Sequence, residues 1–167
     1  MNDPLELVET PAPTPDRPAS YPKRILLAVT GKTPQIVTET LWALAMDSEQ
    51  PFVPTHIRLL TTEEGRRHAV EKLLNPESGA FHALCRDWKL GPVDFDESCI
   101  QVLSKEGRPV EDIVSPHDNE ITADQICAWV KEATSDPQTA VHVSLAGGRK
   151  TMGYYAGYAL SLFGRDQ

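Results

Sequence analysis

The feature that most constrains this chain is a regular alternation of short β-prone runs with longer helical segments. Four runs have the aliphatic and β-branched residues of strands: 25–30 (ILLAVT), 56–61 (HIRLLT), 99–103 (CIQVL) and 140–146 (AVHVSLA). Helical patterns lie between and after them, over 33–45, 63–74, 80–88, 122–133 and 150–163. Alternating strands and helices form parallel sheets through right-handed crossovers. The sequence therefore predicts an α/β fold: a Rossmann-like, mostly parallel sheet with helices on both faces.

Two threonines mark expected helix starts. Thr33 precedes a proline, so we expect Thr33 as the N-cap and Pro34 as the first helical residue. Thr122 is expected to cap the helix over 122–133, with residues 118–120 forming a turn ahead of it. That turn has a second interpretation, as a polar loop that reaches the ligand site or a partner subunit.

Residues 1–22 differ in composition from the rest and contain six of the 14 prolines. Such a segment buries too little apolar surface to offset its ordering entropy, so we expect a disordered lead-in, with a docking tail as the alternative. Residues 23–167 are then one Rossmann-like domain. Four parallel strands make a thin sheet with an exposed edge, and the chain stops directly after a helix. We therefore expect a domain truncated at its C-terminus and lacking one or more strands, which the intact mass of the natural product would test.

Charge and cysteine usage limit the partners. The chain has 16 Lys and Arg against 24 Asp and Glu, a net charge of −8. This charge argues against binding to long DNA or RNA, because neutralisation of phosphates supplies most of that affinity. A local cluster of cations still suffices for a small anion. No run is apolar enough to cross a membrane or to act as a signal segment. The three cysteines are isolated and form no CxxC, which indicates reduced thiols and a cytoplasmic protein.

Two turns between a strand and a helix combine glycine, hydroxyl and cationic residues. The candidate ligand-binding residues in them are Thr30, Gly31, Lys32, Thr33 and Gln35 in the first, and Gly147, Gly148, Arg149, Lys150 and Thr151 in the second. Glycine lets the backbone approach a ligand, and a helix N-terminus favours phosphate. In a doubly wound sheet the first and fourth strands are neighbours, so both turns should meet at one crevice. Lys32, Arg149 and Lys150 would bring three positive charges there.

Each feature also has a purely structural interpretation when taken alone. Thr33 is a helix cap in any case, a Gly-Gly pair is most often a tight turn, and single lysines and arginines are most often solvated. Tyr154, Tyr155 and Tyr158 are more typical of a helix surface and core than of base stacking. The Walker A loop, GxGxxG and GxSxG motifs are absent. The histidines are scattered, and the sequence gives no support for a metal site.

Four segments nevertheless occur in an order that is specific when they are taken together: 29–41 (VTGKTPQIVTETL), 60–65 (LTTEEG), 116–120 (PHDNE) and 144–153 (SLAGGRKTMG). They resemble the motifs of the CRISPR-associated ring nucleases, which carry a CRISPR-associated Rossmann fold (CARF) domain. The similarity extends over about residues 23–164. Members of that family continue into further strands.

The resemblance implies a homodimer that binds cyclic tetra-adenylate, the messenger of type III CRISPR defence, across its two-fold axis. It implies metal-independent cleavage to linear di-adenylate with 2′,3′-cyclic phosphate ends, which switches off the antiviral signal. The catalytic hydroxyl corresponds to Thr33 and the catalytic lysine to Lys150. Arg149 would assist Lys150 in stabilising phosphorane charge, and Gln35 would read an adenine edge. Two alternatives stay open: a CARF sensor that binds cyclic oligoadenylate without turnover and regulates an effector, and a nucleotide-metabolising α/β enzyme of another kind.

Overall fold

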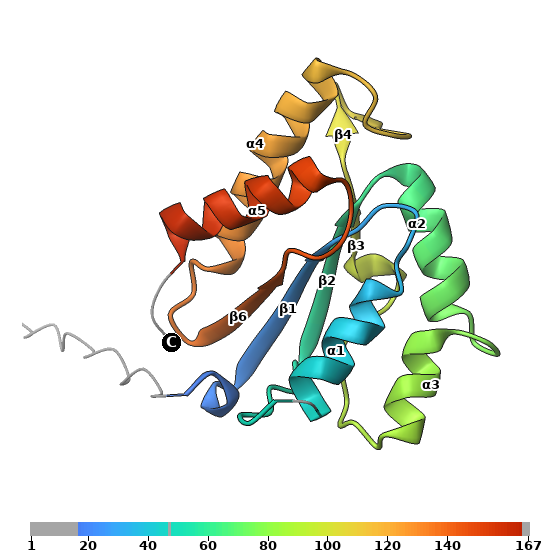
Figure 1. The fold of residues 1–167 in the computed structure, drawn as a ribbon, viewed down its shortest axis with the longest axis vertical. Coiled ribbons are helices and arrows are strands. Elements are labelled where there is room, and N and C mark those ends of the chain that lie inside the picture. The colour runs from blue at the N-terminus through green and yellow to red at the C-terminus, as the bar shows by residue number, and fades with distance from the viewer. Residues whose placement is uncertain (1–16, 47, 165–167) are drawn as a thin grey trace, which may run out of the picture.

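A four-stranded parallel sheet lies at the centre of the fold, between two layers of helices (Figure 1). The computed structural model describes residues 17–46 and 48–164. The strands are ordered β3-β2-β1-β6 across the sheet, with bounds β1 (Lys23–Val29), β2 (His56–Thr61), β3 (Ile100–Val102) and β6 (Thr139–Ser144). The predicted α/β, Rossmann-like architecture is confirmed, including the pairing of the first and fourth long strands.

The helices divide between the two faces of the sheet. One face is covered by α1 (Ile36–Met46), α2 (Glu63–Ala69), the π-helical turn η2 (Val70–Leu74) and α3 (Ala80–Asp87). The other face is covered by α4 (Pro116–Ala133) and α5 (Lys150–Phe163), as Figure 1 shows. Short 3₁₀ turns, η1 (Pro18–Ser20) and η3 (Glu97–Cys99), and a hairpin of β4 (Ser104–Lys105) and β5 (Arg108–Pro109) complete the fold.

The central strand β1 explains why the sheet needs both helical layers. Successive side chains of a strand point to opposite faces. Ile25, Leu27 and Val29 accordingly pack with the core under α4 and α5, and Leu26 and Ala28 pack with the core under α1 and α3. All five are buried, which is why the strand reads as an unbroken apolar run.

The ordered chain begins earlier than the sequence predicted. Residues 1–16 of the expected lead-in lie outside the described residues, but the prediction of disorder is wrong for residues 17–22. Tyr21 is completely buried in a small cluster with Phe52 and Ala140. The Arg24 guanidinium also donates to the Tyr21 carbonyl at 2.6 Å. One aromatic side chain thus fixes the end of a proline-rich segment to the sheet.

The start of α4 also differs from the prediction. The helix begins at Pro116 with Ser115 as its N-cap, so residues 118–120 are helical and do not form a turn. The Ser115 hydroxyl accepts from the Asp118 N–H, and the Asp118 carboxylate accepts from the Ser115 N–H, which is a capping box. Thr122 lies inside the helix, six residues after Pro116, where its hydroxyl donates to the Asp118 carbonyl at 2.7 Å. Its N-cap assignment was therefore wrong.

This capping box makes a testable contribution to acid stability. Hydrogen bonds with Ser115 and Lys105 lower the pKa of Asp118 from 3.8 to about 2. Because the folded pKa lies below that of the unfolded chain, the carboxylate stabilises the fold above about pH 4, and this contribution is lost as the pH falls toward 2. We expect Asp118→Asn to flatten the dependence of the free energy of unfolding on pH in that window, measured by urea denaturation at each pH. Asp124→Asn, at an exposed site on the same helix, should keep the parent slope. Equal slopes for Asp118→Asn and the parent would contradict the prediction.

Candidate functional site

The first candidate turn follows β1 and is anchored by Thr30, which is fully buried. The Thr30 N–H donates to the Leu60 carbonyl of β2 at 3.1 Å, and the Thr30 carbonyl accepts from the Thr61 hydroxyl at 2.7 Å. Lys32 and Thr33 come next and are both exposed. The neighbouring strand therefore fixes the base of the turn and leaves its tip open to solvent.

Helix α1 begins later than the sequence predicted. Its first residue is Ile36, so Thr33 does not directly precede the helix and Pro34 is not its first residue. Pro34 and Gln35 form a turn of their own, closed by the Val37 N–H, which donates to the Pro34 carbonyl at 3.0 Å. The prediction of Thr33 as the immediate cap is therefore wrong, and the Thr33 hydroxyl lies in the exposed part of the turn.

The second turn joins β6 to α5 and depends on two glycines. A Cβ atom on Gly147 would lie 2.2 Å from the Val29 carbonyl oxygen, so only glycine fits against β1 at this position. Gly148 has a φ of +72°, the left-handed region that glycine adopts without strain. The chain then enters α5 at Lys150, and Arg149 makes no capping hydrogen bond with its side chain. The first turn of this 14-residue helix is therefore open to a ligand.

The two turns are in direct contact, as the sequence predicted. Strands β1 and β6 pair in parallel up to Ala28 and Ser144, so both chains leave the sheet at the same edge. A Cβ atom on Gly31 would lie 3.7 Å from the Cα atom of Gly148, an ordinary van der Waals distance. No side chain separates the turns at this point. The carboxyl edge of adjacent parallel strands is the usual ligand site of open α/β sheets.

A cleft of about 210 Å³ opens beside this contact. Its lining combines both turns with the residue after β2 and the segment before α4: Gly31, Lys32, Thr62, Asp112, Ile113, Gly148, Arg149 and Met152. Four of these, Gly31, Lys32, Gly148 and Arg149, are predicted ligand-binding or catalytic residues. The cleft therefore brings predicted residues of both turns together.

Carboxylates accompany two of the three cations expected here. The Lys32 ammonium lies 2.9 Å from Glu64 Oε2, and this hydrogen bond raises the pKa of Lys32 above its ordinary value. The Arg149 guanidinium donates to both oxygens of Asp112, at 3.0 and 2.9 Å. Burial would raise the pKa of Asp112, but the Arg149 and Ile113 hydrogen bonds outweigh it and keep that pKa low. The local excess of positive charge is thus smaller than the sequence suggested.

Lys150 is the third cation and lies in a neighbouring depression. This shallower hollow, of about 580 Å³, is lined by Ile113, Val114, Asn119, Gly148, Arg149, Lys150 and Thr151. Lys150 is exposed, and its ammonium forms no ion pair within the described residues. The Thr151 hydroxyl donates to Asn119 Oδ1 at 3.0 Å, which ties α5 to α4 beside it. Gly148 and Arg149 line both hollows, so the two lie side by side.

The remaining predicted residues lie at the margin or beneath the site. Thr33 and Gln35 are not among the residues that line either hollow. Thr30 lies beneath the first turn, and Gly147 packs against β1. The Thr30 Oγ1 and Gln35 Oε1 atoms are buried and have no hydrogen-bond partner within the described part of the chain. Two unpartnered polar atoms under a candidate ligand loop mark places where a bound molecule or water would be stabilising.

Sequence reasoning missed four residues of the cleft, of which two, Thr62 and Asp112, are polar. Thr62 follows β2, so its position at the same sheet edge could have been inferred from the strand pattern. Its hydroxyl accepts from the Gly65 N–H at 3.2 Å and caps α2. Asp112 lies in an irregular segment, and no local pattern connects it to Arg149, 37 positions later.

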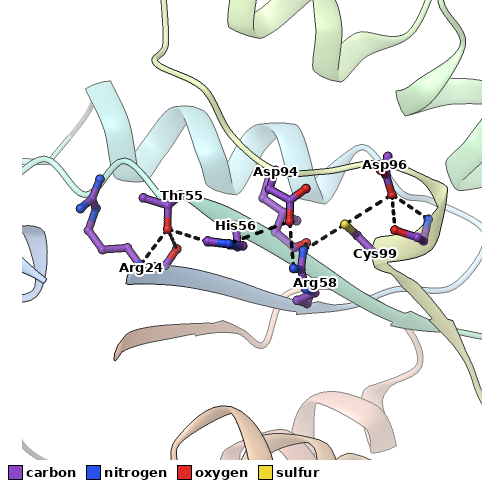
Figure 2. Close-up of polar contacts among 9 residues, drawn as sticks. Arg24, Thr55, His56, Arg58, Asp94, Asp96 and Cys99 are labelled. Carbon is purple, nitrogen blue, oxygen red and sulfur yellow. Dashed lines mark hydrogen bonds and ion pairs between the residues drawn. The ribbon is translucent and has the colours of Figure 1, made fainter. Parts of the chain in front are cut away.

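A second polar cluster lies near the amino ends of the strands, outside this site (Figure 2). There Arg58 donates to Asp94 Oδ2 at 2.9 Å and to Cys99 Sγ at 3.0 Å. Thr55 Oγ1 lies 2.7 Å from His56 Nδ1, while His56 Nε2 lies 4.0 Å from Asp94 Oδ2. Burial and then Arg58 lower the pKa of His56.

This cluster has the composition of a hydroxyl–imidazole–carboxylate triad but not its geometry. The His56 to Asp94 distance of 4.0 Å exceeds hydrogen-bond reach. The Thr55 hydroxyl is held by the backbone of β1, since it accepts from the Arg24 N–H at 2.9 Å and donates to the Arg24 carbonyl at 3.1 Å. Figure 2 shows these groups pointing toward one another, and they connect β2 with the segments on either side. We assign the cluster a structural role.

Neither a metal-binding cluster nor a membrane-spanning helix occurs in residues 17–46 and 48–164. No group of three His, Cys, Asp or Glu side chains in these ranges is arranged to hold a metal ion. No helix within the same ranges has the length and apolarity required to span a bilayer. All three cysteines are free thiols.

Comparison with known proteins identifies a family. A family model described as CRISPR-associated protein NE0113 matches residues 33–167. The matched region includes Thr33, the whole second turn and α5, together with the segment that contains Asp112. No curated protein matches the chain.

Proposed function

The chain belongs to the CRISPR-associated protein NE0113 family, and from this premise we propose that it binds cyclic tetra-adenylate and cleaves it without a metal ion. The products would be linear di-adenylate with 2′,3′-cyclic phosphate ends, and cleavage would switch off an antiviral signal in the cytoplasm. The observation that carries the proposal is the contact between the two glycine turns, which brings Lys32, Arg149 and Lys150 to one edge of the sheet.

The edge suits a phosphodiester for two reasons. The N-terminus of α5 combines unpaired N–H donors with the positive end of a helix dipole, both of which favour phosphate. Lys150, at the first residue of that helix, adds an ammonium that is unpaired within residues 17–46 and 48–164. The carboxylates of Asp112 and Glu64 neutralise the charges of Arg149 and Lys32. A ligand at this site would therefore have to be an anion that competes with those carboxylates for the two cations.

The proposed reaction needs positioning and charge stabilisation. The ribose 2′-oxygen attacks its own phosphorus, and the bond from phosphorus to the 5′-oxygen of the next nucleotide breaks. The 2′-hydroxyl releases its proton to water, and the departing 5′-oxygen takes up a proton, giving a cyclic phosphate and a free 5′-hydroxyl. Lys150 and Arg149 would stabilise the charge that develops on the phosphorane oxygens. The Thr33 hydroxyl would orient the ribose, and holding the 2′-oxygen in line supplies much of the rate.

The size of the ligand supports a homodimer. The cleft of about 210 Å³ is smaller than the roughly 300–1,000 Å³ of pockets that take a drug-sized molecule, and the hollow beside it is shallow and open to solvent, so one copy would not enclose four nucleotides. Helix α5, which starts at the site, also exposes an apolar stripe. Tyr154, Tyr158 and Leu162 are 67%, 52% and 55% exposed, and the two tyrosine rings stack at 6.5 Å. We propose this stripe as the surface that joins the second copy and duplicates the site.

One observation favours a second candidate function, a sensor that binds the ring without cleaving it and regulates an effector. Thr33, the proposed catalytic hydroxyl, does not line either hollow, whereas Lys32 and Arg149, whose charges would bind phosphate, do. A sensor needs those binding residues alone.

The deciding experiment is incubation with cyclic tri-, tetra- and hexa-adenylate in EDTA, followed by chromatography of the products. The nuclease proposal predicts conversion of cyclic tetra-adenylate to di-adenylate with 2′,3′-cyclic phosphate ends. Tight binding with no product would establish the sensor instead. If mononucleotides bound better than every ring in calorimetry, neither function would hold.

The ion pair between Lys32 and Glu64 leads to a prediction about affinity. Glu64→Gln removes the charge that competes with a phosphate for Lys32. Exposed ion pairs contribute about 0–1 kcal/mol, so we expect cyclic tetra-adenylate to bind about two- to five-fold more tightly in calorimetry. Glu71→Gln, at an exposed position of η2, should leave the affinity at the parent value. Unchanged or weaker binding in Glu64→Gln would mean that Glu64 positions Lys32 and does not compete for it.

A further inference from the structure

A pair of tryptophans lies on the surface between α1 and α3, away from the candidate site. Trp42 on α1 is 37% exposed, and Trp88, directly after α3, is 49% exposed. Their rings meet edge to face, with centroids 6.1 Å apart and an interplanar angle of 71°. The third tryptophan, Trp129, is only 8% exposed and packs in the core. Two large aromatic rings in mutual contact at the surface form an exposed apolar patch, and such patches are typical of binding sites.

The end of α3 holds Trp88 in this position. The Trp88 N–H donates to the Leu84 carbonyl at 3.0 Å, and the Leu90 N–H reaches back to the Cys85 carbonyl at 3.0 Å. Lys89, between them, has a φ of +50°, a left-handed conformation that is uncommon outside glycine. The chain thus turns sharply just after Trp88, and the ring stays against Trp42.

The two rings border a shallow groove of about 440 Å³. Its lining is Thr38, Glu39, Trp42, Ala80, Ala83, Leu84, Asp87 and Trp88. Small alanines form part of the lining, and two carboxylates lie among the aromatic residues. Within the described residues, Glu39 forms no ion pair. Asp87 pairs there only with its exposed neighbour Arg86, at 3.3 Å. The groove therefore combines aromatic faces with negative charge.

We propose that this groove, which we call the Trp42–Trp88 groove, binds an arginine or lysine side chain of a protein partner. A cation is attracted to the face of an indole ring, and Trp is the strongest aromatic partner for it. Glu39 and Asp87 would neutralise the same cation from the rim. An acidic ligand would be repelled by these carboxylates, and a purely apolar one would desolvate them without compensation.

A second copy of the chain is the less suitable occupant. Two identical grooves brought face to face would juxtapose Glu39 and Asp87 with their own copies, and like charges across an interface are destabilising. The groove also lies on the helices of one sheet face, whereas the α5 stripe lies on the other. A basic partner could therefore bind here while α5 is occupied, so the inference is independent of the proposed nuclease activity.

The test follows the indole N–H signals of the ¹⁵N-labelled chain during titration with acetyl-Gly-Arg-Arg-Gly-amide. We expect saturable shifts for Trp42 and Trp88 and none for Trp129. The matched peptide with citrulline in place of both arginines keeps the shape and loses the charge, and it should bind at least ten-fold more weakly. Equal binding of the two peptides, or no response to either, would overturn the proposal.

Variants connect the response to the groove. Trp88→Ala should abolish the shift of the Trp42 signal. Because half of the Trp88 side chain is buried, circular dichroism must verify that this variant still folds. Glu39→Gln and Asp87→Asn should each weaken binding several-fold, and Asp124→Asn on α4 should leave it unchanged. Parent-like binding in both carboxylate variants would contradict the role of charge. Self-association in sedimentation that Trp88→Ala removes would identify a second copy as the occupant and also overturn the proposal.

Discussion

Lys150→Ala is expected to slow cleavage of cyclic tetra-adenylate by about 100- to 1,000-fold, the usual effect of removing one donor to a developing oxyanion. Lys150 is the first residue of α5 and has no ion pair within the described residues, so its charge is fully available to a phosphate. The side chain is exposed, so its removal should not disturb the fold. Single-turnover assays with labelled ring would measure the chemical step directly.

Binding and cleavage should separate in this variant. Removing one of several cations weakens the ground-state complex modestly, whereas the charge on the phosphorane exists only in the transition state. Lys72→Ala, an exposed lysine on η2, provides the matched control and should cleave at the parent rate. If Lys150→Ala cleaved as fast as the parent, the mechanism proposed here would be abandoned. An equal loss of binding and cleavage would instead indicate a role in capture alone.

Gly147→Ala is expected to lower the free energy of unfolding by about 3 kcal/mol, at the upper end of ordinary overpacking. The added Cβ would lie 2.2 Å from the Val29 carbonyl oxygen and 3.0 Å from Ile36 Cγ2. The first contact is with the backbone of the central strand, which cannot rotate aside as a side chain would. Relief requires β1 and the second turn to move apart, so ligand binding should fall as well. Urea denaturation followed by circular dichroism would measure the loss.

Gly91→Ala is the matched control, because a Cβ at that position meets nothing within 4 Å. Gly91→Ala changes the entropy of the unfolded chain in the same way as Gly147→Ala but causes no steric clash. The free energy of unfolding of Gly91→Ala should therefore stay within about 1 kcal/mol of the parent value. Parent-like stability in Gly147→Ala would mean that the two turns can separate at low cost. In that case their contact would not be a fixed element of the site.

The parts of the fold that the sequence predicted correctly are those determined by local pattern. The unbroken apolar run of β1 indicated burial on both faces, and glycines beside cations after two strands indicated a common edge. The start of α4 was predicted wrongly at Thr122, although Ser115, Pro116 and Asp118 have the residue types of a capping box that begins with proline. Thr122 competed for that assignment, since a threonine inside a helix can donate to a carbonyl four residues back.

The features that were missed depend on tertiary contacts. The burial of Tyr21 needs Phe52 and Ala140, which lie far along the chain. Likewise the partners of Lys32 and Arg149 are carboxylates at positions 64 and 112, and no spacing rule connects them. Charge counting along the sequence therefore overestimated how cationic the site is. The neutralising residues become visible only once the segments are folded together.

The pairing of β1 with β6 has a consequence for how the site is lost. The two strands are in register over six residue pairs, from Lys23 with Thr139 to Ala28 with Ser144, and each turn begins within two residues of that ladder. The gap between the loops is thus set by interstrand spacing, about 4.8 Å, and not by mobile side chains. Because β6 is an edge strand of the sheet, opening the gap requires only that β6 separate from β1 along this ladder, and the pocket should be lost in that local opening, before global denaturation.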